Sequence, residues 1–457
     1  MNNKKRYPLK NLFGRILSPF ENFLHSTTSG GLVLIGTTLL ALLLATVMGN
    51  ATFHHFWNQS FALSVENAFE LKLSWHHWVN DGLMTLFFLL VGLELKREIL
   101  VGELASLKDA ALPVIAALGG MIVPALIYTG FNPLGTATAS GWGIPMATDI
   151  AFAIGILVLL GERIPKNLII FLTALAIADD LGAVLVIALF YTSHVNLYAL
   201  GIAGALFVGL MLLNQGGIRR SLPYTVIGIL LWYALLTSGI HATLAGILIA
   251  MAIPALSTYQ PKQFQQRISE LSDAFAEEQH EDTSHDALSN HRMASIAGAM
   301  ERTAEAVQSP LQRMEHTLSP WVTFLIIPIF ALSNAGIDLS AIEWEKALAQ
   351  PITLGVTFGL VIGKFLGISV FSWLAIQFGV GRLPNGVNWK HLLGAAWLGG
   401  IGFTMSLFIG QLAFNDPIHI EEAKLGILLA SIASALLGVA WLYIFSDKGE
   451  PNARTIH

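Results

Sequence analysis

The chain has 457 residues, of which 54% are hydrophobic and only 12% are charged, and its formal net charge is −5. Because a soluble protein carries about 25% charged residues, this composition excludes an ordinary soluble globular domain. The acidic balance argues against a nucleic-acid partner, and the lack of cysteine excludes disulfides and thiol chemistry.

Apolar runs of membrane-spanning length dominate the sequence. Residues 1–30 precede them and are basic, without the apolar core and cleavage site of a signal peptide. Each run approaches the ~20 residues that cross ~30 Å of hydrocarbon. In chain order the twelve runs are 31–49, 76–95, 110–129, 141–160, 168–190, 197–214, 223–238, 240–256, 321–336, 352–378, 391–413 and 422–445. The sequence therefore predicts an all-α polytopic membrane protein with about 12 transmembrane helices.

One long polar segment interrupts the spans. The predicted parts are a cytoplasmic amino-terminal segment at 1–30, spans one to eight at 31–256, a polar cytoplasmic loop at 257–320, spans nine to twelve at 321–445 and a cytoplasmic tail at 446–457. Within the loop, the acidic insert 257–309 accounts for the whole net charge. Phe264, Ile268, Leu271 and Phe275 recur there at helical spacing, which predicts an amphipathic helix.

The basic residues predict the orientation of the chain. If the amino terminus is cytoplasmic, all but four of the 25 lysines and arginines lie on the inner side. Lys72, Lys346 and Lys424 fall outside, and Lys364 falls within a span. Because cytoplasmic loops carry an excess of Lys and Arg, both termini are predicted to be cytoplasmic.

Glycine and proline interrupt spans four and eleven, which run in opposite directions. Broken backbone at membrane depth is tolerated only where protein or a water-filled cavity satisfies its polar groups. Paired interruptions of this kind indicate an inverted repeat, here spans three to five against ten to twelve. Glycine-rich spans also serve simply for close helix packing, which is the alternative interpretation. The predicted broken-helix residues are Gly143, Pro145, Gly399, Gly400, Gly402 and Thr404.

Four ionisable residues lie near the centres of spans: Asp149, Asp179, Asp180 and Lys364. A structural ion pair would explain one aspartate with the lysine, but it leaves two further carboxylates unexplained. An unbalanced charge cannot persist in a low dielectric, so a proton or a small hard cation must neutralise it. Thr148 or a freed backbone carbonyl of span four would complete a sodium site. Competition between proton and cation for one site would then produce exchange.

The adjacent aspartates are expected to have different roles. Neighbouring residues on an ideal helix point about 100° apart. We therefore predict that Asp180 coordinates the ion while Asp179 faces Lys364. Asp149 and Lys364 are each expected to offset helix ends that the broken spans expose.

Long motifs resemble those of NhaA-type bacterial sodium/proton antiporters. They are WVNDGLMTLFFLLVGLELKREI at 78–99, IPMATDIAFAIG at 144–155, ALAIADDLGAVLVIALFY at 174–191, SGIHATLAG at 238–246, GKFLGISVFSWLAI at 363–376 and GGIGFTMSLFIG at 399–410. The resemblance implies electrogenic exchange in the bacterial inner membrane, with more H⁺ entering than Na⁺ leaving and with Li⁺ also accepted. It implies no cofactor, and it suggests a homodimer formed through residues 51–75.

The resemblance also implies roles for particular residues. It marks Asp179 and Asp180 as the central site for the transported Na⁺, with Asp149 and Thr148 nearby and Lys364 paired with Asp179. It further implies a pH-responsive cluster at the cytoplasmic side. One other residue, outside this cluster, is also a candidate functional residue. The cluster comprises Glu94, Glu98, His241 and Glu315, and the further candidate is Asp81. His241 lies near the outer side in the topology predicted here, and the insert 257–309 is longer than the family connection.

Three other classes of protein compete with an antiporter. A cation channel would need similar polar groups, but with weak binding along a continuous pore. A proton-coupled transporter of another small solute would need a larger cavity than one cluster of oxygen ligands. An intramembrane enzyme would need a metal pair or a triad, and neither motif occurs in the sequence.

Overall fold

The computed structural model describes residues 29–65, 69–192, 195–257, 259–281 and 290–446. The predicted segment 1–30 and the tail 446–457 lie almost entirely outside these residues. The amino-terminal half contains α2 (Ser29–Met48), α3 (Asn50–Asn58), β1 (Ser60–Val65), β2 (Phe69–Ser74), α4 (Trp75–His77), η2 (Trp78–Leu83), α5 (Met84–Val101), η3 (Glu103–Ala105), α6 (Leu107–Phe131), η4 (Ala139–Met146), α7 (Ile150–Leu159), η5 (Gly161–Arg163), α8 (Lys166–Phe190), α9 (Leu197–Gln215), α10 (Ser221–Ser238) and α11 (Leu244–Ala252).

The carboxyl-terminal half is also helical. It contains α12 (Pro261–Glu281), α13 (His291–Val307), α14 (Pro310–Trp321), η6 (Val322–Ile326), α15 (Ile327–Asn334), α16 (Trp344–Ala349), α17 (Pro351–Phe358), η7 (Gly359–Gly363), α18 (Lys364–Gln377), α19 (Trp389–Leu398), α20 (Phe403–Ala413) and α21 (Pro417–Phe445). Polar side chains fix several helix starts, because they accept hydrogen bonds from the first free backbone N–H groups. Asn196 does so for α9, Ser309 for α14 and Asp416 for α21.

Within the described ranges, nine helices are long and apolar enough to cross a membrane, or ten if α19 and α20 form one span. Each of the twelve predicted runs contains helix, but two of them fall short of a regular apolar span. In α5, Glu94, Lys96, Arg97 and Glu98 occupy the last two turns. In the eighth run a turn after Gly239, whose φ is 83°, delays the start of α11 to Leu244.

Both predicted helix breaks are present. In the fourth run the 3₁₀ segment η4 ends at Met146, and three non-helical residues precede α7. In the eleventh run α19 and α20 are bent by 44° around residues 399–402. Three π-helical segments, η2, η6 and η7, interrupt other long helices. Such segments are rare in α-helices and frequently lie at functional sites.

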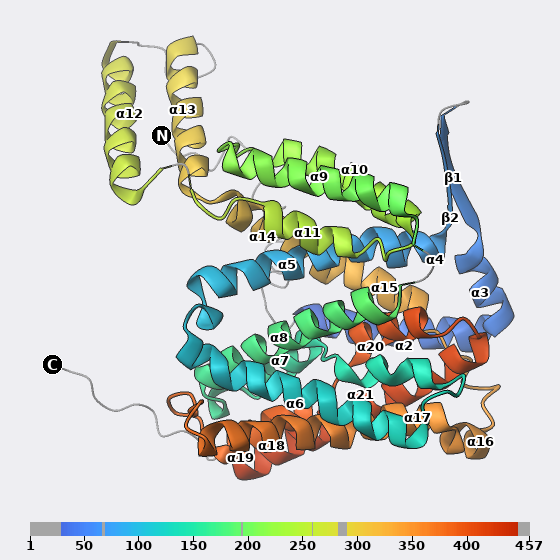
Figure 1. Ribbon diagram of the computed structural model, residues 1–457. Coiled ribbons are helices and arrows are strands. Elements are labelled where there is room, and N and C mark those ends of the chain that lie inside the picture. Colours follow the sequence, from blue (N-terminus) through green and yellow to red (C-terminus); the bar gives the residue numbers. More distant parts are fainter. Residues whose placement is uncertain (1–28, 66–68, 193–194, 258, 282–289, 447–457) are drawn as a thin grey trace, which may run out of the picture.

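The helices run roughly side by side between two ends of the molecule (Figure 1). At one end α12 and α13 form a projecting helical hairpin, and we call this the insert end. The amphipathic helix predicted around Phe264–Phe275 is present as α12. At the opposite end β1 and β2 pair antiparallel, with Ser60 opposite Ser74, and we call this the strand end. The hairpin is the one sheet among the described residues of an otherwise helical fold.

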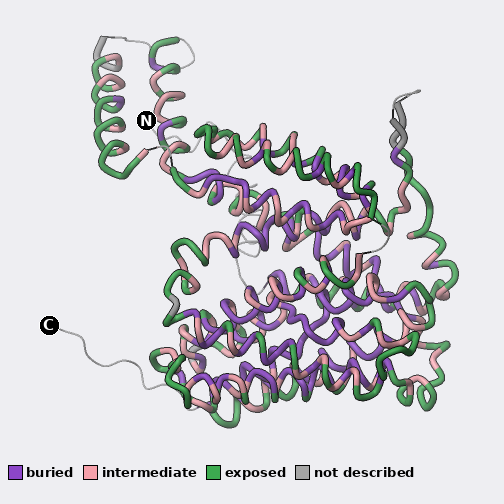
Figure 2. The backbone as a smooth tube through the Cα atoms, in the orientation of Figure 1, coloured by how far each residue is buried: buried purple, intermediate pink, exposed green. Residues whose placement is uncertain are grey.

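Large apolar side chains cover the outer faces of the helices. Leu39, Leu189 and Leu222 are among many that are more than half exposed. Figure 2 shows buried residues concentrated inside the helix layers and exposed residues on their outer surfaces. A soluble monomer rarely exposes so much contiguous apolar surface, whereas lipid chains cover it without penalty. The surface is therefore that of a protein whose helices face lipid.

Helices α6 and α18 approach each other backbone to backbone. A Cβ atom on Gly367 would collide with the carbonyl of Gly119, and a Cβ atom on Gly119 would collide with Gly367 and Phe371. Small residues at such crossings allow tight packing where lipid removes the usual hydrophobic driving force. The crossing holds Lys364, the first residue of α18, against Gly120 of α6.

Candidate ion site between the broken helices

The two broken segments satisfy each other's backbone groups at their crossing. The Asp149 N–H donates to the carbonyl of Ile401 at 2.6 Å. Thr148 Oγ1 donates to the carbonyl of Gly399 at 2.8 Å. A Cβ atom on Gly402 would lie 2.9 Å from the carbonyl oxygen of Ala147, so only glycine permits this approach. The crossing therefore meets the requirement that freed backbone groups at membrane depth find partners in the protein.

Asp149 joins the starts of two half-helices. Its Oδ1 accepts a hydrogen bond from Phe152 N at 3.1 Å, which caps α7. Its Oδ2 accepts from Thr404 N at 3.0 Å and from Thr404 Oγ1 at 2.7 Å, in the first turn of α20. Helix N-termini carry partial positive charge, so a carboxylate between two of them is stabilised without a full counter-ion. The arrangement matches the role expected for Asp149 at exposed helix ends.

Asp179 is paired with Lys364. The Lys364 ammonium lies 2.5 Å from Asp179 Oδ2, and both side chains are 0% exposed. Lys364 follows directly after the π-helical η7, and Asp179 lies near the middle of α8. Breaking a buried ion pair of this kind leaves an uncompensated charge, which is strongly unfavourable.

Asp180 lies in a different environment, although it is the next residue. It is 1% exposed, and within the part of the chain that the structure describes no donor reaches its buried Oδ1. Asp180 also lines a cavity of about 540 Å³, together with Thr148, Asp149 and Thr404. An unpartnered carboxylate beside a cavity can be neutralised there by a proton or by a cation.

The cavity reaches toward the insert end. Glu94 of α5 and His316 of α14 also line it. Beside them, Arg97 contacts Glu315 at 3.1 Å and Glu98 at 2.9 Å. Arg97 thus pairs with two of the four candidate pH-response residues, Glu98 and Glu315, and a third, Glu94, lines the cavity one turn away on α5.

His241 does not join that group. It lies at the far end of α8, where its Nε2 donates to the carbonyl of Tyr191 at 2.7 Å. Asp81 lies in η2, and its carbonyl accepts a hydrogen bond from the Trp232 indole at 2.8 Å. Both residues therefore belong to the strand end of the helices rather than to the cavity.

The remaining broken-helix residues hold the two segments in place. Gly143 N donates to the Tyr191 hydroxyl at 3.1 Å, and that hydroxyl donates to the carbonyl of Ser140. Pro145 packs directly against Gly359, and a Cβ atom on that glycine would collide with the proline. Gly400 similarly leaves no room for a Cβ atom beside Ser434.

The sequence analysis did not identify two residues near the site, His316 and Tyr191. His316 follows Glu315 directly, but nothing in its spacing distinguishes it from a surface histidine. Tyr191 ends the long motif at 174–191, and its bond to a backbone 48 residues away has no sequence signature. Over the described ranges no group of three or more His, Asp or Glu forms a metal centre. The oxygen atoms that the crossing offers are those of Asp180, Thr148 and nearby backbone carbonyls.

Comparison with known proteins identifies the family. The family model described as Na⁺/H⁺ antiporter 1 matches residues 21–442. The chain is 60% identical to the Na⁺/H⁺ antiporter NhaA of Syntrophobacter fumaroxidans, with 99% of this chain and 96% of the relative covered. It is 56% identical to the NhaA of Acidithiobacillus ferrooxidans, with 95% and 99% covered. It is 48% identical to NhaA 1 of Saccharophagus degradans, with 94% and 92% covered. The chain therefore belongs to the Na⁺/H⁺ antiporter 1 family.

Proposed function

We propose that this protein exports Na⁺ across the bacterial inner membrane in exchange for a larger number of incoming H⁺, and that it also accepts Li⁺. The observation that supports this most directly is Asp180, a buried carboxylate without a donor on its Oδ1 that opens onto a cavity. The names of the related proteins support the same activity.

Exchange follows from the chemistry of Asp180. When ionised, it offers oxygen ligands to a dehydrated Na⁺, and Thr148 Oγ1 keeps free lone pairs because it donates its own hydrogen to Gly399. When protonated, the same carboxylate is neutral and releases the cation. An empty ionised site is too unfavourable at membrane depth to move between the two sides, so each transition carries either proton or cation.

A second proton makes the exchange electrogenic. We assign it to the Asp179–Lys364 pair as a unit, because strongly coupled groups share their titration. Entry of Na⁺ beside Asp180 adds positive charge next to this pair and favours loss of a proton from it. Two protons would then enter for each sodium ion that leaves.

Movement between inward and outward access would occur at the two broken segments. The proposal places twelve spans in the membrane, with spans three to five and ten to twelve as inverted repeats and both termini at the cytoplasmic insert end. The cavity would then open to the cytoplasm in the described conformation. Glu94, Glu98 and Glu315, with Arg97, would control access to it as pH changes. Residues 51–75 would join two copies in a homodimer.

Everted membrane vesicles with a fluorescent proton probe test the proposal. Adding Na⁺ or Li⁺ to acidified vesicles should release protons in the parent protein, whereas K⁺ should not. Asp180→Asn and Asp179→Asn should give no response, while Asp109→Asn, at an exposed position on α6, should behave like the parent. Exchange that persists in Asp180→Asn would overturn the assignment of the ion ligand. Sodium movement without proton movement would indicate a channel.

A further inference from the structure

A second buried lysine lies at the strand end. Lys424, in the second turn of α21, is only 3% exposed. Its ammonium donates to the carbonyl of Gly336 at 3.4 Å. Considering only residues that the structure describes, no carboxylate oxygen lies within 4.0 Å of this ammonium. The proposed exchange mechanism gives this buried charge no role.

Polar groups surround Lys424 at the end of α15. Asn334 Nδ2 donates to Asn80 Oδ1 at 2.9 Å, and Asn80 Nδ2 donates to His76 Nε2 at 3.0 Å. His76 Nδ1 in turn lies 3.1 Å from Ser333 Oγ. These side chains come from η2, α4 and α15, so they form a buried polar group between elements. We call Asn80, Asn334, His76 and Ser333 the outer polar cluster.

The charge of Lys424 acts on nearby residues that belong to several different helices. Burial, and secondarily this charge, lower the pKa of His54 on α3 to about 4. Lys424 also interacts electrostatically with His76. Glu421 of the same helix is the nearest compensating acid, and it is itself engaged by the Asn50 side chain of α3.

Helix α20 connects this region to the ion site. Its first turn contains Thr404, which bonds to Asp149. Its last turns contain Gln411, whose side chain interacts with His76. Seven residues of helix separate the two, which is about 10 Å along the axis. The outer polar cluster and Lys424 are thus placed one short helix away from the aspartates, on the side opposite the cavity.

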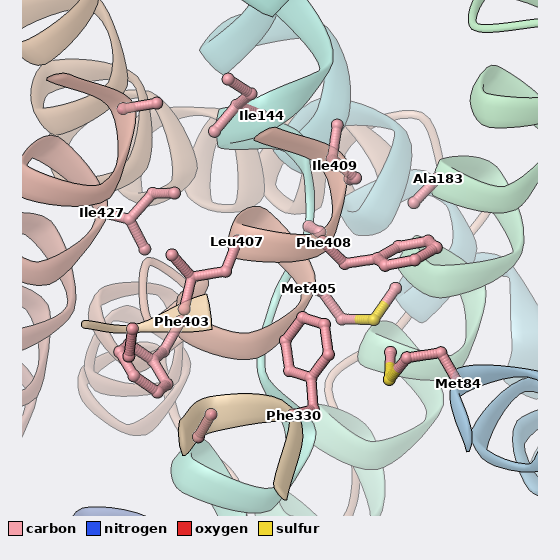
Figure 3. Packing of buried hydrophobic residues seen from close by; sticks show 14 of the residues in the cluster. Met84, Ile144, Ala183, Phe330, Phe403, Met405, Leu407, Phe408, Ile409 and Ile427 are labelled. Carbon is pink, nitrogen blue, oxygen red and sulfur yellow. The ribbon is translucent and has the colours of Figure 1, made fainter. Parts of the chain in front are cut away.

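A layer of apolar side chains lies between the two regions in the described conformation. Phe408 of α20 packs against Phe88 at 5.4 Å and against Phe330 at 6.3 Å between ring centroids. Figure 3 shows Phe408 and Phe330 converging with Met84 and Met405 in this layer. If the layer opens while the cavity closes, the route outward from Asp180 passes the outer polar cluster and Lys424.

We propose that Lys424 is an affinity-determining residue of the outward route: its positive charge weakens Na⁺ binding from outside and so favours release of exported sodium. The inference rests on the proposed exchange function and its orientation. Asn80 and Asn334 supply neutral oxygen ligands for a passing ion, while Lys424 prevents that ion from settling. A neutral or acidic residue at position 424 would allow external Na⁺ to occupy the site at lower concentration.

A purely structural role for Lys424 makes a different prediction. Gly336 follows the carboxyl end of α15, so the ammonium stabilises the negative end of that helix. Loss of this contact alone would lower stability and the maximal rate in both directions of transport. It would leave the ratio of external to internal sodium affinity unchanged. The two roles are therefore separable by measuring sodium affinity from each side.

The experiment compares vesicles of opposite orientation. Radioactive Na⁺ movement coupled to a proton gradient is measured in right-side-out and in everted vesicles, and the half-saturating Na⁺ concentration is obtained for each side. The variants are Lys424→Met, which removes the charge, and Lys424→Arg, which keeps it. Lys390→Met, at an exposed position on α19 near the insert end, is the matched control.

Lys424→Met should lower the external half-saturating concentration by at least about threefold, because the charge acts on the outer polar cluster, which only sodium arriving from outside passes. Its internal value should stay within about twofold, and Lys424→Arg and Lys390→Met should match the parent on both sides. Equal changes on both sides, or no change in Lys424→Met, would overturn the inference. A parent protein that exchanges no sodium for protons would instead overturn the proposed function.

Discussion

Two lone charges lie inside this protein, and the surroundings of each differ instructively. Asp180 lines a cavity and, among the described residues, no donor reaches its Oδ1, whereas Lys424 donates to a helix-end carbonyl. A proton or cation arriving through the cavity can neutralise the first charge, so its neutralisation is reversible. The second charge is compensated by the carbonyl of Gly336 and by Glu421, which are fixed parts of the fold. Asp180 is therefore suited to exchanging a proton for a cation, whereas Lys424 is suited to acting on a nearby ion through its electric field.

The largest expected effect comes from removing the exchangeable charge. Asp180→Asn deletes the ionised oxygen that a cation needs, so Na⁺ affinity should fall at least about 100-fold, or ~3 kcal/mol. Isothermal calorimetry in two buffers of different ionisation enthalpy would detect both binding and proton release. The parent should release protons when Na⁺ binds, and Asp180→Asn should show neither signal. Sodium binding by the parent without proton release would refute competition at this site.

The next effect concerns the paired carboxylate. Lys364→Met leaves Asp179 without its partner at 2.5 Å, and breaking such a buried pair costs about 3–5 kcal/mol. Thermal unfolding in detergent should show a large drop in the midpoint. The double variant Lys364→Met/Asp179→Asn should recover part of the loss, because it leaves no uncompensated charge. If the double variant is less stable than Lys364→Met, the pair is not the source of the effect.

A smaller effect is expected at the crossing of the broken segments. Thr404→Val removes one of the three hydrogen bonds to Asp149 and should destabilise the protein by about 1–3 kcal/mol. Thr404→Ser keeps the hydroxyl and serves as the control. We expect Na⁺ affinity to fall with Thr404→Val, because Asp149 and Asp180 line the same cavity. Indistinguishable affinities for the two variants would show that this bond does not shape the site.

The smallest effect tests the environment of His54, where burial and then the charge of Lys424 disfavour protonation. His54 has a folded pKa of about 4 against an ordinary value of 6.5, so the unfolded chain binds more protons between these pH values. His54 should therefore lower stability as pH falls from 6.5 toward 4. The His54→Gln variant should lose less stability than the parent across this window, measured by thermal unfolding. His55→Gln, on an exposed neighbour, should follow the parent, and parallel curves for all three proteins would contradict the assignment.

Local sequence signals predicted the helices and their interruptions well. Apolar runs predicted where helices lie, and glycine and proline predicted the breaks in the fourth and eleventh runs. The turn that shortens α11 was missed, because the apolar pattern continues through Ile240 and Ala242. The strands β1 and β2 were also not foreseen, since residues 51–75 mix aromatic and polar residues without clear alternation.

The site could be predicted only where charge itself was the signal. Four ionisable residues in apolar runs stand out because lipid makes them unfavourable, and charge balance already suggested a pair between an aspartate and Lys364. The hydrogen bonds from Thr148 to Gly399 and from Thr404 to Asp149 join positions about 250 residues apart in the chain. Such contacts depend on how the helices cross, which no local pattern records. The burial of Lys424 likewise depends on neighbours from distant spans.

The glycine contact between α6 and α18 restricts how this molecule can change shape. Gly119 and Gly367 leave no room for one helix to slide along the other without a collision of main-chain atoms. We therefore expect spans three and ten, one from each proposed repeat, to move together. A rocking motion would then take place between other helices. The boundary between the moving parts would therefore differ from the boundary between the two repeats.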